Sequence, residues 1–153
     1  MNPFAELERL GLKLPTPARP EGMYIPGVQV GDLYYTAGEG AVVDGEPIVT
    51  GKVGAEVTLE QAREAARVSM LNLLAILDDQ LESLVRVKRI VKVLGFVASA
   101  DGFTQQPVVI DGASELLIQV FGDAGRHARS AIGVAELPQG SPVEIELVCQ
   151  VER

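Results

Sequence analysis

The chain has 153 residues, a length at which one globular domain with its own core is expected. Hydrophobic residues make up 47% of it and the mean hydropathy is +0.21, which excludes a disordered chain. The net charge of -8 argues against nucleic acid as a partner, because a phosphate backbone requires a basic surface.

The first 20 residues predict a short helix followed by an extended, proline-rich segment. Asn2 is a suitable N-cap with Pro3 in the first turn, and the prolines between residues 14 and 20 prevent a second helix. Two hairpins are expected next, because short apolar runs flank the turn residues Gly31-Asp32 and Asp44-Gly45.

Two long amphipathic helices are predicted around one buried strand. Thr58 and Gln61 form a capping box at the start of the first helix, which extends to residue 81. Residues 89–98 are apolar on both faces, as in a central strand, and a second helix is expected from Thr104 to Gly122.

Residues 126–146 predict a strand, a Pro/Gly turn and a returning strand, and therefore a hairpin. Arg129 lies at its open end among small side chains, where its guanidinium would be accessible to a carboxylate or phosphate. Glu144 and Glu146 share the polar face of the returning strand. Cys149 is on the apolar face and should be buried, with no internal disulfide possible.

These elements predict a single α+β domain over residues 1–153, with a mixed sheet and two long helices on one face. Since the central strand is apolar on both sides, the second sheet face should be buried against other copies of the chain. No signal peptide or membrane span is recognisable, so a cytoplasmic protein with no membrane partner is expected.

The C-terminal run A-R-S-A-I-G-V-A-x-L-P-x-G-x-P-V-E-I-E resembles the RidA/YjgF superfamily, also called L-PSP endoribonucleases. An upstream pattern adds to the likeness, which covers roughly residues 20 to 153; it consists of Tyr24, Gly27, Val28, Gly31, Thr36 and Gly38. The resemblance implies a chorismate-mutase-like subunit that forms a homotrimer with ligand clefts between neighbours. It implies no metal and no organic cofactor.

The resemblance also assigns candidate roles to individual residues. Arg129 would grip a substrate carboxylate, and Glu144 would orient the attacking water. Asp111 falls near a polar family position on the second long helix. The remaining candidates for substrate binding are Tyr24, Gly38, Glu39, His127, Ser130 and Ala131.

Each assignment has a purely structural alternative. Arg129 could form an internal ion pair, and Glu144 and Asp111 could be ordinary solvated carboxylates. Tyr24 could be a half-buried aromatic residue without a role. His127 could also be structural; as the single histidine it argues against a histidine metal site or a catalytic triad, and two nearby arginines should favour its neutral form.

Several positions depart from the family pattern. Ala131 replaces a reactive cysteine, Ala37 and Glu39 replace a serine and a glutamine, and His127 replaces a proline. The charge of Glu39 would disfavour a carboxylate ligand unless Arg126 or Arg129 offsets it, and could instead select a cationic or amino-bearing ligand.

The leading functional hypothesis is a small-molecule hydrolase that resembles 2-iminobutanoate/2-iminopropanoate deaminases. The alternative is a non-catalytic trimeric module that senses a small carboxylate metabolite. An endoribonuclease, which the older family name suggests, is disfavoured by the acidic charge balance.

Overall fold

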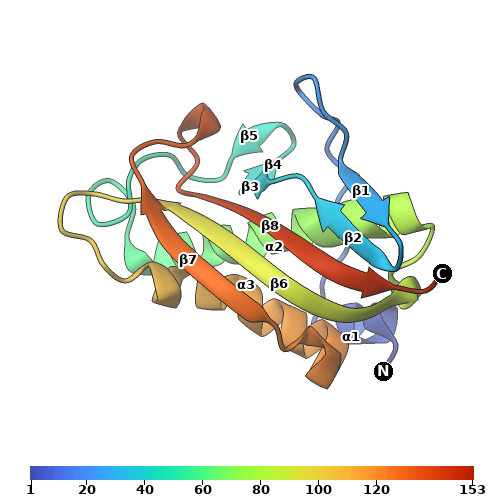
Figure 1. Cartoon of the computed structure of the whole chain (residues 1–153). Helices are drawn as coiled ribbons and strands as arrows, with labels where there is room; N and C mark the ends of the chain where they lie inside the picture. The colour runs from blue at the N-terminus through green and yellow to red at the C-terminus, as the bar shows by residue number, and fades with distance from the viewer.

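The computed structural model describes residues 1–153 and is built on one mixed β-sheet (Figure 1). The strands lie in the order β1-β2-β8-β6-β7, and β3 adds to β8 beyond this path. Their bounds are Gly27–Val30 (β1), Leu33–Thr36 (β2), Glu39–Gly40 (β3), Val87–Ala98 (β6), Ala128–Val134 (β7) and Val143–Val151 (β8). A separate small hairpin consists of β4 (Val42–Val43) and β5 (Glu46–Pro47).

The prediction that residues 126–146 form a hairpin is wrong. Its two strands, β7 and β8, both exist, but β6 lies between them, parallel to β7 and antiparallel to β8. The Pro/Gly turn, which includes the short helix η3 (Pro138–Gly140), therefore carries the chain across the end of β6. Glu144 consequently pairs with Phe96 and not with a residue of β7.

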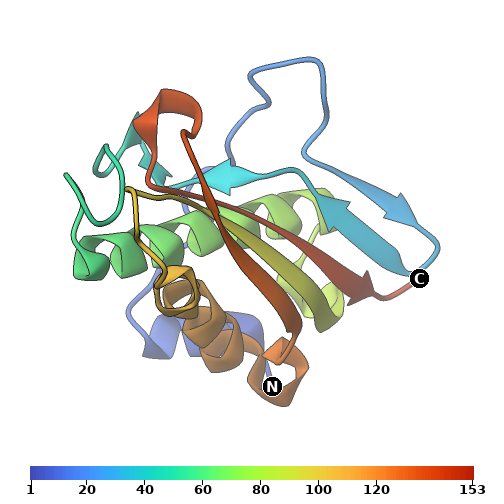
Figure 2. The ribbon, with the colours of Figure 1, turned by 60° about the vertical axis from the view of Figure 1, so that its left-hand side comes forward.

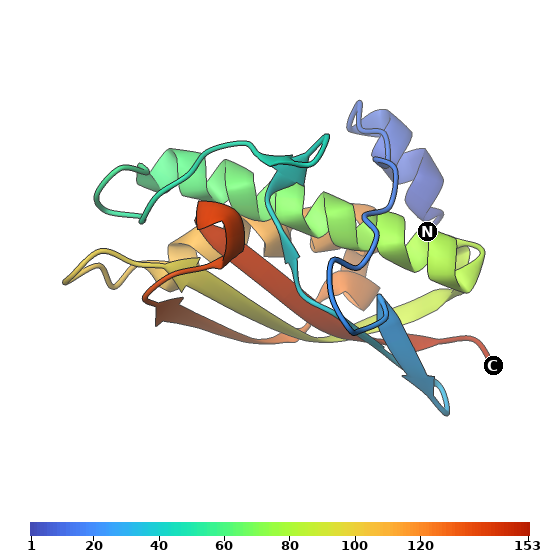
Figure 3. The same ribbon diagram turned by 90° about the horizontal axis from the view of Figure 1, so that it is seen from above.

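The two long helices, α2 (Leu59–Leu81) and α3 (Gln106–Phe121), cover one face of the sheet, as predicted (Figure 3). The capping box of Thr58 and Gln61 is present at the start of α2. The helices pack closely at Gly112, where a Cβ would lie 2.2 Å from the carbonyl oxygen of Arg63. Two further single turns, η1 (Leu84–Arg86) and η2 (Gly122–Gly125), precede β6 and β7.

The N-terminal part agrees with the sequence prediction. Helix α1 (Pro3–Arg9) is capped by the side chain of Asn2, and the proline-rich segment then runs without regular structure towards β1 (Figure 2). Both expected turns have the left-handed backbone that they require, with φ +63° at Gly31 and φ 52° at Asp44.

The core lies between the helices and the sheet, and it includes the buried thiol of Cys149. The opposite sheet face has no covering element (Figure 3). Tyr35 and Ile132 are each 45% exposed on it, and Leu94 and Phe96 are half-buried. The second apolar face of the central strand is therefore only partly covered within one chain. None of the helices is long and apolar enough to span a membrane.

Candidate functional site

The predicted site residues fall into two groups on opposite faces of the sheet. Arg129 on β7 pairs in register with Val93, which is fully buried beneath the helices. Glu144 pairs with Phe96, three positions further along β6 and thus on the other face, because side chains alternate along a strand. Arg129 and Glu144 of one chain therefore do not share a cavity.

A cavity of about 160 Å³ brings together four of the candidates, Tyr24, Gly38, Glu39 and Glu144. The pairing of β3 with β8 places Glu39 opposite Ile145 and beside Glu144. A Cβ at position 38 would lie 2.9 Å from Oε2 of Glu144, so a larger residue there would displace the Glu144 carboxylate from its present position. Tyr24, which is 51% exposed, also lines an adjoining cavity of about 520 Å³ together with Glu144.

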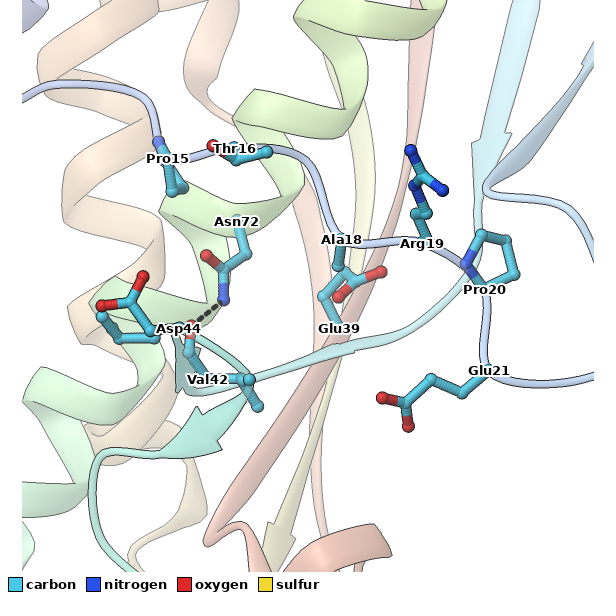
Figure 4. Close-up of a pocket in the computed structure, with 12 residues that line it drawn as sticks. Pro15, Thr16, Ala18, Arg19, Pro20, Glu21, Glu39, Val42, Asp44 and Asn72 are labelled. Carbon is cyan, nitrogen blue, oxygen red and sulfur yellow. Dashed lines mark hydrogen bonds between the residues drawn. The ribbon is translucent and has the colours of Figure 1, made fainter.

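Helix α2 holds the backbone beside Glu39. The Asn72 amide donates to the carbonyl oxygens of Gly40 at 3.1 Å and Val42 at 2.9 Å, and the Ser69 hydroxyl donates to the carbonyl of Glu39. Figure 4 shows Asn72 reaching from the helix to Val42. These bonds anchor a strand of only two residues, and no motif in the sequence indicated them.

The proline-rich segment forms a second wall that the sequence did not predict. Residues 18, 19 and 21 line the cavity with Glu39 and also an adjoining one of about 500 Å³ (Figure 4). None of the six ion pairs in the structure includes Glu39 or Glu144. Three carboxyl groups, those of Glu21, Glu39 and Glu144, therefore line one cavity, and Arg19, which lines it too, forms no ion pair with any of them.

This environment changes the acidity of Glu39 and Glu144. Burial, followed by the charges of Glu144 and Glu21, raises the pKa of Glu39 from 4.5 to about 7. Burial and the charge of Glu146 also raise the pKa of Glu144. A carboxyl group with a pKa near 7 can both accept and donate a proton at neutral pH, which is the requirement for acid–base catalysis.

The raised pKa of Glu39 predicts a pH-dependent stability. Between pH 4.5 and 7 the folded chain binds more protons at Glu39 than the unfolded chain, so this group lowers the free energy of unfolding as pH rises through that window. Glu39→Gln should remove the decline and make the protein more stable than the wild type above pH 7. We expect about 1 kcal/mol, because the carboxyl is partly exposed and screened by solvent.

Urea unfolding of both proteins at pH 4.5, 6 and 8 measures this effect. The difference in the free energy of unfolding should be largest at pH 8 and should disappear at pH 4.5. A constant difference at all three pH values would show that Glu39 does not titrate in this window.

Arg129 lies in a different cavity, of about 220 Å³, lined by Ser114, Ile118, Arg126, His127 and Arg129. Its guanidinium is less open than the sequence suggested: the side chain is 21% exposed, and Nη1 forms an ion pair with Oδ1 of Asp111 at 2.8 Å. Nη1 also donates to Ser114 Oγ at 3.1 Å, and Nη2 donates to the Pro107 carbonyl at 3.2 Å.

These three bonds leave two of the five guanidinium donors for a ligand. The internal ion pair that the sequence allowed is therefore present, and Arg129 still borders a cavity. An incoming carboxylate would have to share its charge with Asp111.

His127 makes two hydrogen bonds that fix its protonation. Nδ1 lies 2.6 Å from the Gly125 carbonyl, and Nε2 lies 2.9 Å from Ser114 Oγ. A carbonyl only accepts, so Nδ1 carries the hydrogen and the Ser114 hydroxyl donates to Nε2. Burial, and to a smaller degree the charge of Arg129, lowers the pKa of His127, so the ring is neutral at pH 7.

The remaining candidates on β7 lie apart from these bonds. Ser130 is on the uncovered sheet face, where its hydroxyl accepts from Nζ of Lys92 at 3.2 Å, and Ala131 is on the helix side and packs against the core. Arg126 is exposed and pairs with Asp123. No group of three or more His, Cys, Asp or Glu residues is close enough to hold a metal ion.

Two similar proteins in curated collections span nearly the whole chain. Protein TCP17 of Trypanosoma cruzi is 40% identical over 148 residues, which are 96% of this chain and 92% of that protein. A 2-iminobutanoate/2-iminopropanoate deaminase of Dermatophagoides farinae is 30% identical over 142 residues, which are 92% of this chain and 95% of that protein.

A solved structure also matches nearly the whole chain. A protein of unknown function from Agrobacterium tumefaciens superposes with a TM-score of 0.90 at 38% identity, covering 97% of this chain and 91% of that one. Residues 5–150 match the model of the family described as "YjgF/chorismate_mutase-like, putative endoribonuclease". The chain therefore belongs to the YjgF/chorismate-mutase-like family.

Proposed function

We propose that the protein hydrolyses small imines that carry a carboxylate, at sites formed between neighbouring copies of a homotrimer. The observation that carries this proposal is the division of the candidate residues between two cavities. One cavity offers a guanidinium with free donors, and the other offers two carboxyl groups with raised pKa. A carboxylate-bearing imine requires both kinds of group.

The uncovered sheet face supports the assembly. Exposed and half-buried apolar side chains, among them Tyr35, Phe96 and Ile132, lie on the face where Glu144 emerges. Burying such a face against another copy is favourable by about 25 cal/mol for each Å² of apolar surface. The deaminase of Dermatophagoides farinae, at 30% identity, supports the reaction class.

The proposed chemistry begins with a 2-imino acid whose carboxylate lies on the two free donors of Arg129. Glu144 of the neighbouring copy aligns a water molecule, which attacks the imine carbon, and takes one proton from it. Glu144 returns this proton to nitrogen, which leaves a hydroxyl and an amino group on one carbon. Glu144 then transfers the hydroxyl proton to the amino group, the O–H electron pair becomes the second C–O bond, and ammonia leaves with the C–N electron pair as the 2-oxo acid forms. No metal or organic cofactor enters this scheme.

Mixed trimers test both the site and its position between copies. Arg129→Ala and Glu144→Gln should each be inactive towards freshly generated 2-aminoacrylate, measured by ammonia release. Co-expression of the two variants should restore about a quarter of the wild-type activity, because random assembly leaves that share of interfaces with both residues intact. A wild-type protein without activity would overturn the proposal. Mixed trimers that regain no activity would show that both residues of a site come from one chain.

A trimeric binding module remains the second candidate, and the altered motif around Glu39 favours it. Ala37 and Glu39 replace the serine and glutamine of the family pattern, whereas Arg129 keeps two free donors for a carboxylate. Thermal stabilisation by 2-oxobutyrate without any turnover of 2-aminoacrylate would support binding alone. Endoribonuclease activity is the third candidate; the net charge of -8 disfavours it, and RNA cleavage that survives Arg129→Ala would support it.

A further inference from the structure

The cavity that contains Glu144 adjoins a larger cavity, and Glu39 lines both. The smaller cavity, of about 160 Å³, and the larger one, of about 500 Å³, share residues 18, 19, 21, 39 and 42 in their walls. Glu144 lines only the smaller of the two, whereas Asp44 and Asn72 line only the larger. Glu39 therefore lies between the proposed catalytic carboxylate and a second, larger cavity.

The larger cavity has more room than the smallest 2-imino acids require. The side chain of 2-iminobutanoate is only an ethyl group, which is small beside a cavity of about 500 Å³. Cavities of about 300–1,000 Å³ typically hold ligands of drug size. A substrate whose reacting carbon lies at Glu144 can therefore extend a longer side chain past Glu39.

Acidic side chains dominate the walls along this path. Glu21 and Glu39 line both cavities and Asp44 lines the larger one, while Arg19 is the only basic residue in either wall. None of these four side chains forms an ion pair. Figure 4 shows the guanidinium of Arg19 directed away from Glu21. The carboxylates therefore outnumber the one cation, and each of them is available to a positively charged ligand.

The spacing of these carboxylates favours an organic cation over a metal ion. No three of them are close enough together to hold a metal. An ammonium or a guanidinium, in contrast, needs only one or two carboxylate partners at hydrogen-bond distance. Glu39 is the best placed of the three, because Ser69 and Asn72 of α2 fix the backbone at residues 39 and 40 and the side chain is half-buried. A charge pair in such a position is screened less than one at the surface.

We propose that Glu39 is a specificity-determining residue that selects 2-imino acids whose side chain ends in an amine or a guanidine. This inference rests on the proposed function and names the substrate class of the same site. The substrate carboxylate lies on Arg129 of one copy, the reacting carbon lies at Glu144 of the neighbouring copy, and the cationic end of the side chain lies at Glu39. The charge of Glu39 then recognises the end of the substrate that is remote from its carboxylate.

This selectivity should rise with pH, because protonation of Glu39 removes the charge that recognises the cation. Burial, followed by the charges of Glu144 on β8 and Glu21 in the proline-rich segment, raises the pKa of Glu39 to about 7, so the change falls between about pH 6 and 8. Asp44 and Arg19 are the other charged groups in the cavity walls. Glu144 also has a raised pKa, but it acts on every substrate, so its effect cancels in the ratio of two substrates.

Two substrates of the same shape separate charge from size. An amino-acid oxidase converts arginine and citrulline into 2-imino acids that end in a guanidinium and in a neutral urea group. At pH 8, kcat/KM for the arginine-derived imine should exceed that for the citrulline-derived imine about tenfold, because the urea loses a hydrogen bond between charged groups. The ratio should fall towards one at pH 6. Consumption of each imine is measured with catalase present and corrected for its hydrolysis in buffer.

Glu39→Gln should bring the ratio of the two kcat/KM values near one at both pH values, with little change for the citrulline-derived imine. Glu46→Gln is the matched control, because Glu46 is exposed and lines neither cavity, and it should keep the wild-type ratio. Thermal shifts with the two 2-oxo products give a readout without turnover. At pH 8 the arginine-derived 2-oxo acid should raise Tm of the wild type more than the citrulline-derived one, and both should act equally on Glu39→Gln.

The results separate this inference from the proposed function. If the wild type hydrolyses 2-aminoacrylate without preferring the arginine-derived imine, or if Glu39→Gln keeps that preference, the selection by Glu39 is wrong and the deaminase proposal stands. If the wild type hydrolyses none of the three imines, the deaminase proposal fails, and the inference about its substrates fails with it. Equal thermal shifts of the wild type with the two 2-oxo acids also overturn the selection by Glu39.

Discussion

Replacing Arg129 with alanine should lower kcat/KM for a carboxylate-bearing imine at least about 100-fold, since a lost charge-assisted contact costs on the order of 3 kcal/mol. Arg129→Lys should recover only part of the activity, because an ammonium keeps the charge but loses the planar pair of donors. Steady-state kinetics on freshly generated substrate measure both variants.

Asp111→Asn is the matched variant, and it should strengthen the binding of an anionic substrate, whereas Arg129→Ala should weaken it. Asp111 now shares the charge of Arg129 through a 2.8 Å contact, so its neutralisation should lower KM for an anionic substrate. Urea unfolding must show that each variant is folded. Equal KM values in Asp111→Asn and the wild type would show that the ion pair does not compete with the ligand.

Gly112→Ala should destabilise the protein by about 2–3 kcal/mol, although alanine normally stabilises a helix relative to glycine by up to about 1 kcal/mol. The reversal follows from the 2.2 Å separation between the added Cβ and the carbonyl oxygen of Arg63. Backbone atoms of α2 would have to move, and the contact between the two long helices would open.

Gly31→Ala serves as the control for Gly112→Ala. Gly31 has φ +63° and no atom within 4 Å of an added Cβ, so only backbone strain of about 1 kcal/mol is expected. Urea unfolding compares the two variants directly. A Gly112→Ala protein as stable as the wild type would show that the helices can separate without cost.

Local signals in the sequence predicted most of the elements. The capping box at Thr58, the N-cap at Asn2 and the turn residues Gly31 and Asp44 act within a few positions along the chain, and each is found where expected. The pairing of the two strands in residues 126–146 as a hairpin was wrong, because a Pro/Gly turn between two strands has the same local pattern whether or not a third strand lies between them. The parallel pairing of β6 with β7 is a long-range property.

The site was predictable to a smaller extent. Glu39 and Glu144 meet only because β3 pairs with β8, about a hundred positions later in the chain, so no spacing rule could join them. Asp111 and Ser114 are different: three residues apart on a helix, they share one face, and this spacing could have indicated a polar pair facing β7. The contact of His127 with Ser114 again depends on tertiary packing.

The central position of β8 in the sheet also affects how the chain folds during its synthesis. This strand joins β2, β3 and β6, and it is synthesised after all of them. A nascent chain that has not reached residue 143 holds the β1–β2 hairpin and the β6–β7 pair as separate pieces with unsatisfied edges. Such pieces are prone to wrong pairing with other chains. Because the sheet cannot close before β8 is synthesised, holding chaperones should bind stalled chains that lack β8 more strongly than completed ones.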